Sequence, residues 1–161
     1  MTLSRTTLIL LAAGGSAALL LGAFAFQYIG GLPPCPMCLW QRWPHAAAIV
    51  IGLAALLIPA GFLGAALPVL GALAALTTAG IGGFHTGVER GWWAGPSSCS
   101  GDGAGLSGQS GSDLLSLEAP VNVVMCDEVA WQMLGLSMAS WNMLAALVLT
   151  VLWIMAARKA A

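Results

Sequence analysis

The sequence has very little charge. Only 7% of its 161 residues are Asp, Glu, Lys or Arg, whereas 59% are hydrophobic, and the mean hydropathy is +0.91. Soluble domains carry roughly 25% charged residues, so a soluble protein with this composition could not keep its surface solvated. The composition therefore excludes a soluble globular domain and predicts an integral membrane protein.

Basic residues are scarce as well. The chain has 5 Lys and Arg against 6 Asp and Glu, which gives a net charge of −1. Proteins that bind nucleic acid concentrate Lys and Arg on one face, and no stretch of this sequence does so. We therefore expect no nucleic-acid partner, and we expect the lipid bilayer to surround most of the chain.

Four apolar stretches predict membrane helices, each of which needs about 20 apolar residues to cross the hydrocarbon core. Charged residues are absent from positions 6–41 and again from 43–88. A turn at 59–61, which contains proline and glycine, divides the charge-free stretch 43–88 into two spans. We place the spans at about 7–28, 44–58, 64–84 and 138–156. The second is short, and Leu39–Trp43 could extend it. The predicted fold class is all-α integral membrane: an antiparallel four-transmembrane-helix bundle, with residues 1–161 forming a single domain.

The first stretch has one alternative interpretation. Arg5 could begin a secretory signal peptide with a cleavage site at Ala23-Phe24-Ala25. The apolar run is longer than the roughly 7–15 residues of a signal-peptide core. This length favours a membrane span.

The positive charges predict the orientation, because Lys and Arg collect on the cytoplasmic side of membrane helices. Arg5 precedes the first span, and Arg158 and Lys159 follow the last. With four spans, both termini are then cytoplasmic, and the loops at about 29–43 and 85–137 lie on the other side. We expect the second loop to contain a mobile Gly/Ser-rich part and a short helix near Asp113 that lies in the membrane interface.

Small residues recur every four positions in two of the spans. Such spacing lets membrane helices approach closely, although alanine-rich helices also produce it by chance. The positions are Gly14, Ala18 and Gly22 in the first span, and Gly71, Ala75, Ala79 and Gly83 in the third.

All four cysteines fall on the non-cytoplasmic side in this topology, where disulfides are permitted. Cys35 and Cys38 form a CxxC motif in the first loop, and Cys99 and Cys126 lie in the second. Three interpretations fit: structural disulfides, a zinc site, or two redox-active pairs that exchange electrons. A disulfide across CxxC closes too short a loop to stabilise much and is usually redox-active. The wide separation of Cys99 from Cys126 disfavours zinc.

Three stretches resemble the DsbB family of quinone-dependent thiol oxidases. CPMCLWQR, followed by a span, is similar to the CxxCxxxR signature of that family. VMCDEVAWQMLGLSMASWN and FHTGVERGWWAGPSSC are also similar to family members. The resemblance covers most of the chain in the family's order, which is not that of the vitamin K epoxide reductases, whose CxxC follows the loop cysteines.

The resemblance implies an enzyme of the bacterial inner membrane whose redox loops are periplasmic. It would reoxidise a DsbA-like thioredoxin-fold protein and pass electrons through both cysteine pairs to ubiquinone or menaquinone, with no metal. Cys99 would form the mixed disulfide with the partner, and Cys126 would then attack Cys35. Electrons would leave from Cys38. The competing hypothesis is a structural or zinc-binding membrane protein with passive cysteines.

Arg42 is expected beside Cys38 and the quinone. It follows Cys38 by four residues and shares its face if this segment is helical. A guanidinium there would lower the pKa of the thiol and could hydrogen-bond a quinone oxygen, or it could simply extend to lipid headgroups. Pro44 leaves open whether 38–43 is regular helix.

His85 and Glu89 are the other candidate quinone contacts, at the outer end of the third span. His85 could contact the quinone or supply protons, or it could be an ordinary interfacial histidine. Glu89 lies one helical turn further and could assist it. We interpret His45 as structural or interfacial, and we assign no role to Gln41.

Overall fold

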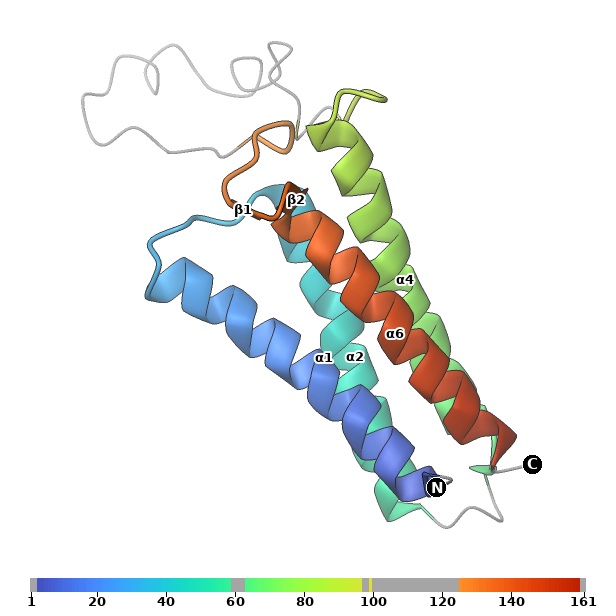
Figure 1. Ribbon diagram of the computed structural model, residues 1–161. Coiled ribbons are helices and arrows are strands. Elements are labelled where there is room, and N and C mark those ends of the chain that lie inside the picture. The colour runs from blue at the N-terminus through green and yellow to red at the C-terminus, as the bar shows by residue number, and fades with distance from the viewer. Residues whose placement is uncertain (1–2, 59–62, 97–98, 100–124, 160–161) are drawn as a thin grey trace, which may run out of the picture.

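Four long helices run antiparallel in an elongated bundle, as the computed structural model in Figure 1 shows. The structure describes residues 3–58, 63–96, 99 and 125–159. Its helices are α1 (Arg5–Tyr28), α2 (Pro36–Leu57), α4 (Ala66–Glu89) and α6 (Met138–Arg158). A two-stranded antiparallel ribbon, β1 (Gln132–Met133) and β2 (Leu136–Ser137), precedes α6.

The predicted fold class is confirmed. In the described part of the chain, α1, α4 and α6 are each long and apolar enough to cross a membrane. The 59–61 turn, the short helix near Asp113 and nearly all of the Gly/Ser-rich part lie outside the described residues. Two boundaries differ from the predicted spans: α2 begins at Pro36 rather than between 39 and 44, and α4 continues to Glu89 rather than ending near 84. Both extra segments carry candidate site residues.

Helix α2 begins early because its first residues form a favourable N-terminus. Cys35 is the N-cap residue, and its Sγ accepts a hydrogen bond from the Cys38 backbone N–H at 3.2 Å. Pro36 follows at the first helical position, where a missing N–H costs nothing. Pro44 lies inside α2, yet the segment 38–43 is helical. The question that Pro44 raised is thereby settled in favour of helix.

The four-residue repeat of small residues on α4 lies at a close helix contact, whereas the repeat predicted on α1 does not. A Cβ at Gly71 would lie 2.5 Å from the Trp153 ring on α6, and Ala75 and Ala79 are buried. A Cβ at Gly14 or Gly22 would meet nothing within 4 Å. The repeat therefore marks the close contact on α4 only. Helix α1 packs closely at other small residues, since a Cβ at Gly15 would lie 2.5 Å from the Leu149 side chain.

Two buried clusters occupy opposite ends of the bundle. The first contains Leu8, Ile9 and Trp153, near the end that carries the chain termini. The second, which we call the cysteine end, contains Cys35, Cys99 and Cys126. Helix α1 diverges from the other helices toward the cysteine end (Figure 1).

Candidate functional site

All four cysteines meet in the cluster at the cysteine end. Cys99 and Cys126 are joined in a disulfide and are buried. Cys35 and Cys38 are free thiols, and the Cys35 Sγ donates a hydrogen bond to the Cys38 Sγ at 2.7 Å. Of the two pairs that the family resemblance implies, Cys99–Cys126 is thus closed and Cys35/Cys38 is open.

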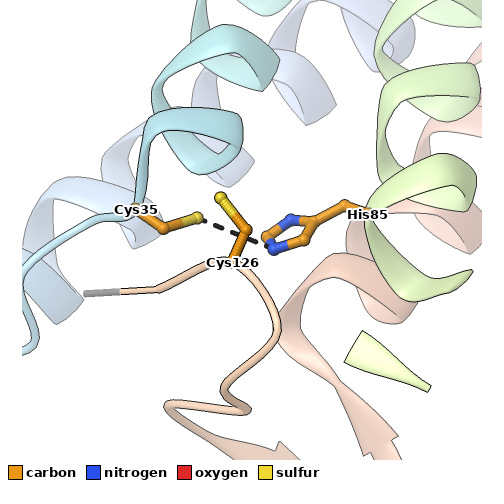
Figure 2. A group of neighbouring side chains, drawn as sticks. All are labelled: Cys35, His85 and Cys126. Carbon is orange, nitrogen blue, oxygen red and sulfur yellow. Dashed lines mark hydrogen bonds between the residues drawn. The ribbon is translucent and has the colours of Figure 1, made fainter. Parts of the chain in front are cut away.

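His85 lies beside one cysteine of each pair, Cys35 and Cys126 (Figure 2). The Cys35 and Cys126 sulfurs and a ring nitrogen of His85 lie within 4.8 Å of one another. The Cys35 Sγ is 3.6 Å from the His85 Nε2. These atom types can bind zinc, but the Cys126 sulfur is already bonded to Cys99 and is not a thiolate. In this redox state Cys126 is therefore not available as a zinc ligand.

The pKa values of the two free thiols are shifted in opposite directions. Cys38 lies in the first turn of α2, before the span expected at 44–58. The hydrogen bond that Cys35 donates raises the pKa of the Cys35 thiol, and burial raises it further. The same hydrogen bond lowers the pKa of Cys38 despite burial. The negative charge of Glu89 raises this pKa and the Arg42 guanidinium lowers it. Cys38 is therefore the thiol of this pair that ionises more readily.

Arg42 points toward α1. Its Nη1 donates to the Gln27 Oε1 at 2.7 Å, and its guanidinium carbon lies 4.9 Å from the centre of the Phe24 ring. Its Nε is buried and has no hydrogen-bond partner among the described residues. Contacts with two α1 side chains do not fit an arginine that merely extends to lipid headgroups.

A cavity of about 360 Å³ lies where α1 diverges from α2 and α6. Its volume is within the range of small-molecule sites. Five of the seven candidate site residues line it: Cys35, Cys38, Arg42, His85 and Glu89. Most of the remaining wall is apolar and includes Phe26, Trp131 and Trp141. Cys99 and Cys126 are not among the residues that line the cavity.

Glu89 is hydrogen-bonded at the N-terminus of α6. Its carboxylate accepts a hydrogen bond from the Ser137 hydroxyl, and its Oε1 lies 3.8 Å from the His85 Nε2. Ser137 is also the N-cap residue of α6 and accepts from the Ser140 N–H at 3.2 Å. The start of α6 therefore fixes Glu89 next to His85.

The sequence analysis missed a buried polar network among α2, α4 and α6. The Asn142 Nδ2 donates to the Gln41 Oε1 at 2.7 Å and contacts the Thr78 Oγ1 at 3.2 Å. The Asn142 Oδ1 lies 2.9 Å from the His45 Nε2. His45 is 3% exposed and is thus inside the bundle rather than at an interface. Polar residues within membrane helices are themselves a signal of function, which could have identified this network.

Comparison with known proteins gives a consistent result. A sequence model of the family described as "Disulfide bond formation protein DsbB" matches residues 5–156. "Disulfide bond formation protein B" of Azoarcus sp. (strain BH72) is 34% identical over 149 residues, covering 89% of this chain and 87% of that protein. The protein of the same name from Methylococcus capsulatus is 37% identical over 129 residues, covering 78% and 77%. No solved structure matches the chain at a significant level.

Proposed function

The chain belongs to the DsbB family of disulfide bond formation proteins, and on this premise we propose a specific reaction. We propose that the protein is an inner-membrane thiol oxidase. It reoxidises a DsbA-like periplasmic dithiol protein and delivers the electrons to membrane quinone. In this proposal both termini are cytoplasmic, the loops at about 29–43 and 85–137 are periplasmic, and residues 1–161 act as one domain.

The closeness of the two cysteine pairs carries this proposal. The Cys35 and Cys126 sulfurs lie within 4.8 Å of each other although they belong to different pairs. Thiol–disulfide exchange needs a thiolate to reach a disulfide sulfur. Only a small movement is required for Cys126 to attack Cys35, whereas passive staples would need no such proximity.

The proposed exchange consists of four thiol–disulfide steps. A partner thiolate attacks the Cys99–Cys126 disulfide at Cys99, and Cys126 leaves as a thiolate. The second partner thiol then releases Cys99 and closes the partner's own disulfide. Cys126 attacks Cys35 of an oxidised first pair, and Cys38 leaves. Cys99 attacks Cys126 and releases Cys35. The electron pair has then moved to Cys35 and Cys38, which is the redox state that the structure describes.

The residues around the cavity fit a quinone. Cys38, which ionises more readily, lines the cavity together with Arg42. The Arg42 Nε is a buried donor that lacks a partner among the described residues, and a quinone carbonyl can accept from it. The apolar wall suits a lipid-soluble ring. A bound quinone, whether ubiquinone or menaquinone, would supply the two-electron acceptor.

The test is anaerobic mixing of the purified protein with a reduced thioredoxin-fold partner and a short-chain ubiquinone, followed by absorbance. We expect wild type to reduce the quinone and to oxidise one partner dithiol for each quinone. Cys38→Ser should abolish this turnover. Sustained turnover by that variant, or none by wild type, would contradict the proposal.

A further inference from the structure

His45 has a buried nitrogen that lacks a partner. Its side chain is 3% exposed, and its Nε2 lies 2.9 Å from the Asn142 Oδ1. Among the described residues, no hydrogen-bond partner contacts its Nδ1, which is also buried. An unsatisfied buried polar atom costs stability, so its retention in an apolar bundle needs an explanation.

The surrounding network determines which nitrogen of His45 carries the proton. The Asn142 amide nitrogen is occupied, because it donates to the Gln41 Oε1 at 2.7 Å and to the Thr78 Oγ1 at 3.2 Å. The Thr78 hydroxyl in turn donates its own proton to the backbone carbonyl oxygen of Gln41 at 3.1 Å. The Asn142 Oδ1 therefore faces His45 and can only accept. His45 must donate from Nε2, which leaves Nδ1 of the neutral ring as an acceptor.

This acceptor belongs to a residue of the cavity wall. His45 and Arg42 both line the cavity, and they are three residues apart on α2, so they share a face of the helix. The unpartnered atom of Arg42 is a donor, and that of His45 is an acceptor. The two oxidation states of a quinone differ in this respect, since a carbonyl oxygen only accepts and a hydroquinone hydroxyl also donates.

We propose that His45 is a binding residue selective for the reduced ring, because its Nδ1 accepts a hydrogen bond from a hydroquinone hydroxyl. Arg42 donates a hydrogen bond to a ring oxygen in either oxidation state. The inference rests on the proposed function, because it takes the ligand to be a quinone. Tighter binding of the hydroquinone raises the reduction potential of the bound ring and favours electron transfer out of Cys35 and Cys38.

Two substitutions at His45 separate its two nitrogens. His45→Gln places an amide nitrogen where Nε2 is and keeps the hydrogen bond to Asn142, but it offers no acceptor in place of Nδ1. His45→Asn places an amide oxygen where Nδ1 is and gives up the contact with Asn142. The first removes the proposed ligand contact and the second preserves it, so each is the control for the other.

The experiment measures equilibrium binding of a short-chain ubiquinone and of its hydroquinone, in a Cys38→Ser background that cannot transfer electrons. His45→Gln should weaken hydroquinone binding by about 3- to 10-fold, as expected for one hydrogen bond, and should leave quinone binding unchanged. His45→Asn should keep most of the preference for hydroquinone. Equal changes for both forms with His45→Gln, while the parent binds both, would overturn the role of His45 alone. A parent that binds neither form would overturn the proposed function with it.

A second measurement needs no substitution at His45. In the Cys38→Ser protein labelled with ¹⁵N at histidine, the Nδ1 resonance of His45 should be that of an unprotonated nitrogen. It should shift when hydroquinone is added and move less with quinone. A protonated Nδ1, or identical responses to the two ligands, would contradict the assignment even if the variants failed to fold.

Discussion

The Nε2 of His85 faces the Cys35 sulfur at 3.6 Å, and the Gln41 amide holds the opposite nitrogen of the ring. The Gln41 Oε1 accepts from Asn142, so its Nε2 is the atom that donates to the His85 Nδ1 at 3.1 Å. An accepting Nδ1 places the proton of the neutral ring on Nε2. His85 thus presents an N–H toward Cys35, and the Cys126 backbone and the Glu89 Oε1, 3.8 Å away, are further acceptors beside it.

We expect His85→Phe to slow the release of Cys35 from a Cys35–Cys126 intermediate. Cys35 leaves with negative charge in that step, and the N–H of His85 stabilises it. Hydrogen bonds to charged groups contribute about 1.5–3 kcal/mol, so the rate should fall by at least about tenfold. Acid-quenched single turnovers, analysed by mass spectrometry, should show the Cys35–Cys126 disulfide accumulating. An unchanged lifetime for this species would exclude the role.

The acidity of Cys38 should appear in its pH-dependent alkylation. The rate rises as the thiolate forms, and the lowered pKa of Cys38 makes this rise occur below the ordinary thiol value of 9.0. Cys35, whose pKa is raised, is the internal control and should stay unreactive over the same range. Cys35→Ser removes the thiol that donates to Cys38, and Arg42→Gln removes the nearby positive charge. Each should move the Cys38 curve to higher pH, and coincident curves for Cys35 and Cys38 would contradict this.

Arg42→Lys should raise the KM for quinone while the charge is kept. Lysine lacks the Nε–H and the planar fork of arginine, so the buried donor on the cavity wall is lost. We expect the KM to rise about tenfold, the lower value for a hydrogen bond from a charged group. Arg90→Lys is the matched control, since the Arg90 guanidinium contacts the Trp92 ring instead. Steady-state turnover at varied quinone concentration gives both values, and equal KM values for the two variants would contradict the prediction.

Gly71→Ala should destabilise the bundle, whereas Gly80→Ala on the same helix should not. A Cβ at Gly71 would lie 2.5 Å from the Trp153 ring, and one at Gly80 would meet nothing within 4 Å. Overpacking of this kind costs about 1–3 kcal/mol, which should lower the thermal midpoint of the protein in detergent. The Gly80 variant controls for the higher helix propensity of alanine. Similar midpoints for both would show that α4 and α6 can separate at this point.

The sequence was sufficient to predict the four apolar helices, because hydropathy follows from composition along the chain. It left the start of α2 open between 39 and 44, and the helix begins at Pro36. Arg42, which is charged, and Pro44, which lacks a backbone N–H, suggested that the helix begins only after them. The Arg42 side chain instead lines the internal cavity, and the helix continues through both positions. The cysteine pairs and Arg42 were found through motifs, which are local in the chain. The contact between Gln41 and Asn142 joins residues 101 positions apart, and no local pattern contains it.

The divergence of α1 has a consequence for how a ligand arrives. The segment 18–26 of α1 forms one wall of the cavity, and it belongs to a helix that is apolar enough to cross a membrane. In the proposed function, a quinone would reach this wall by lateral diffusion through the acyl-chain region and would not have to leave the bilayer. The concentration that governs occupancy is then the mole fraction of quinone in the lipid, so diluting vesicles with buffer should leave occupancy unchanged, while adding quinone-free lipid should reduce it.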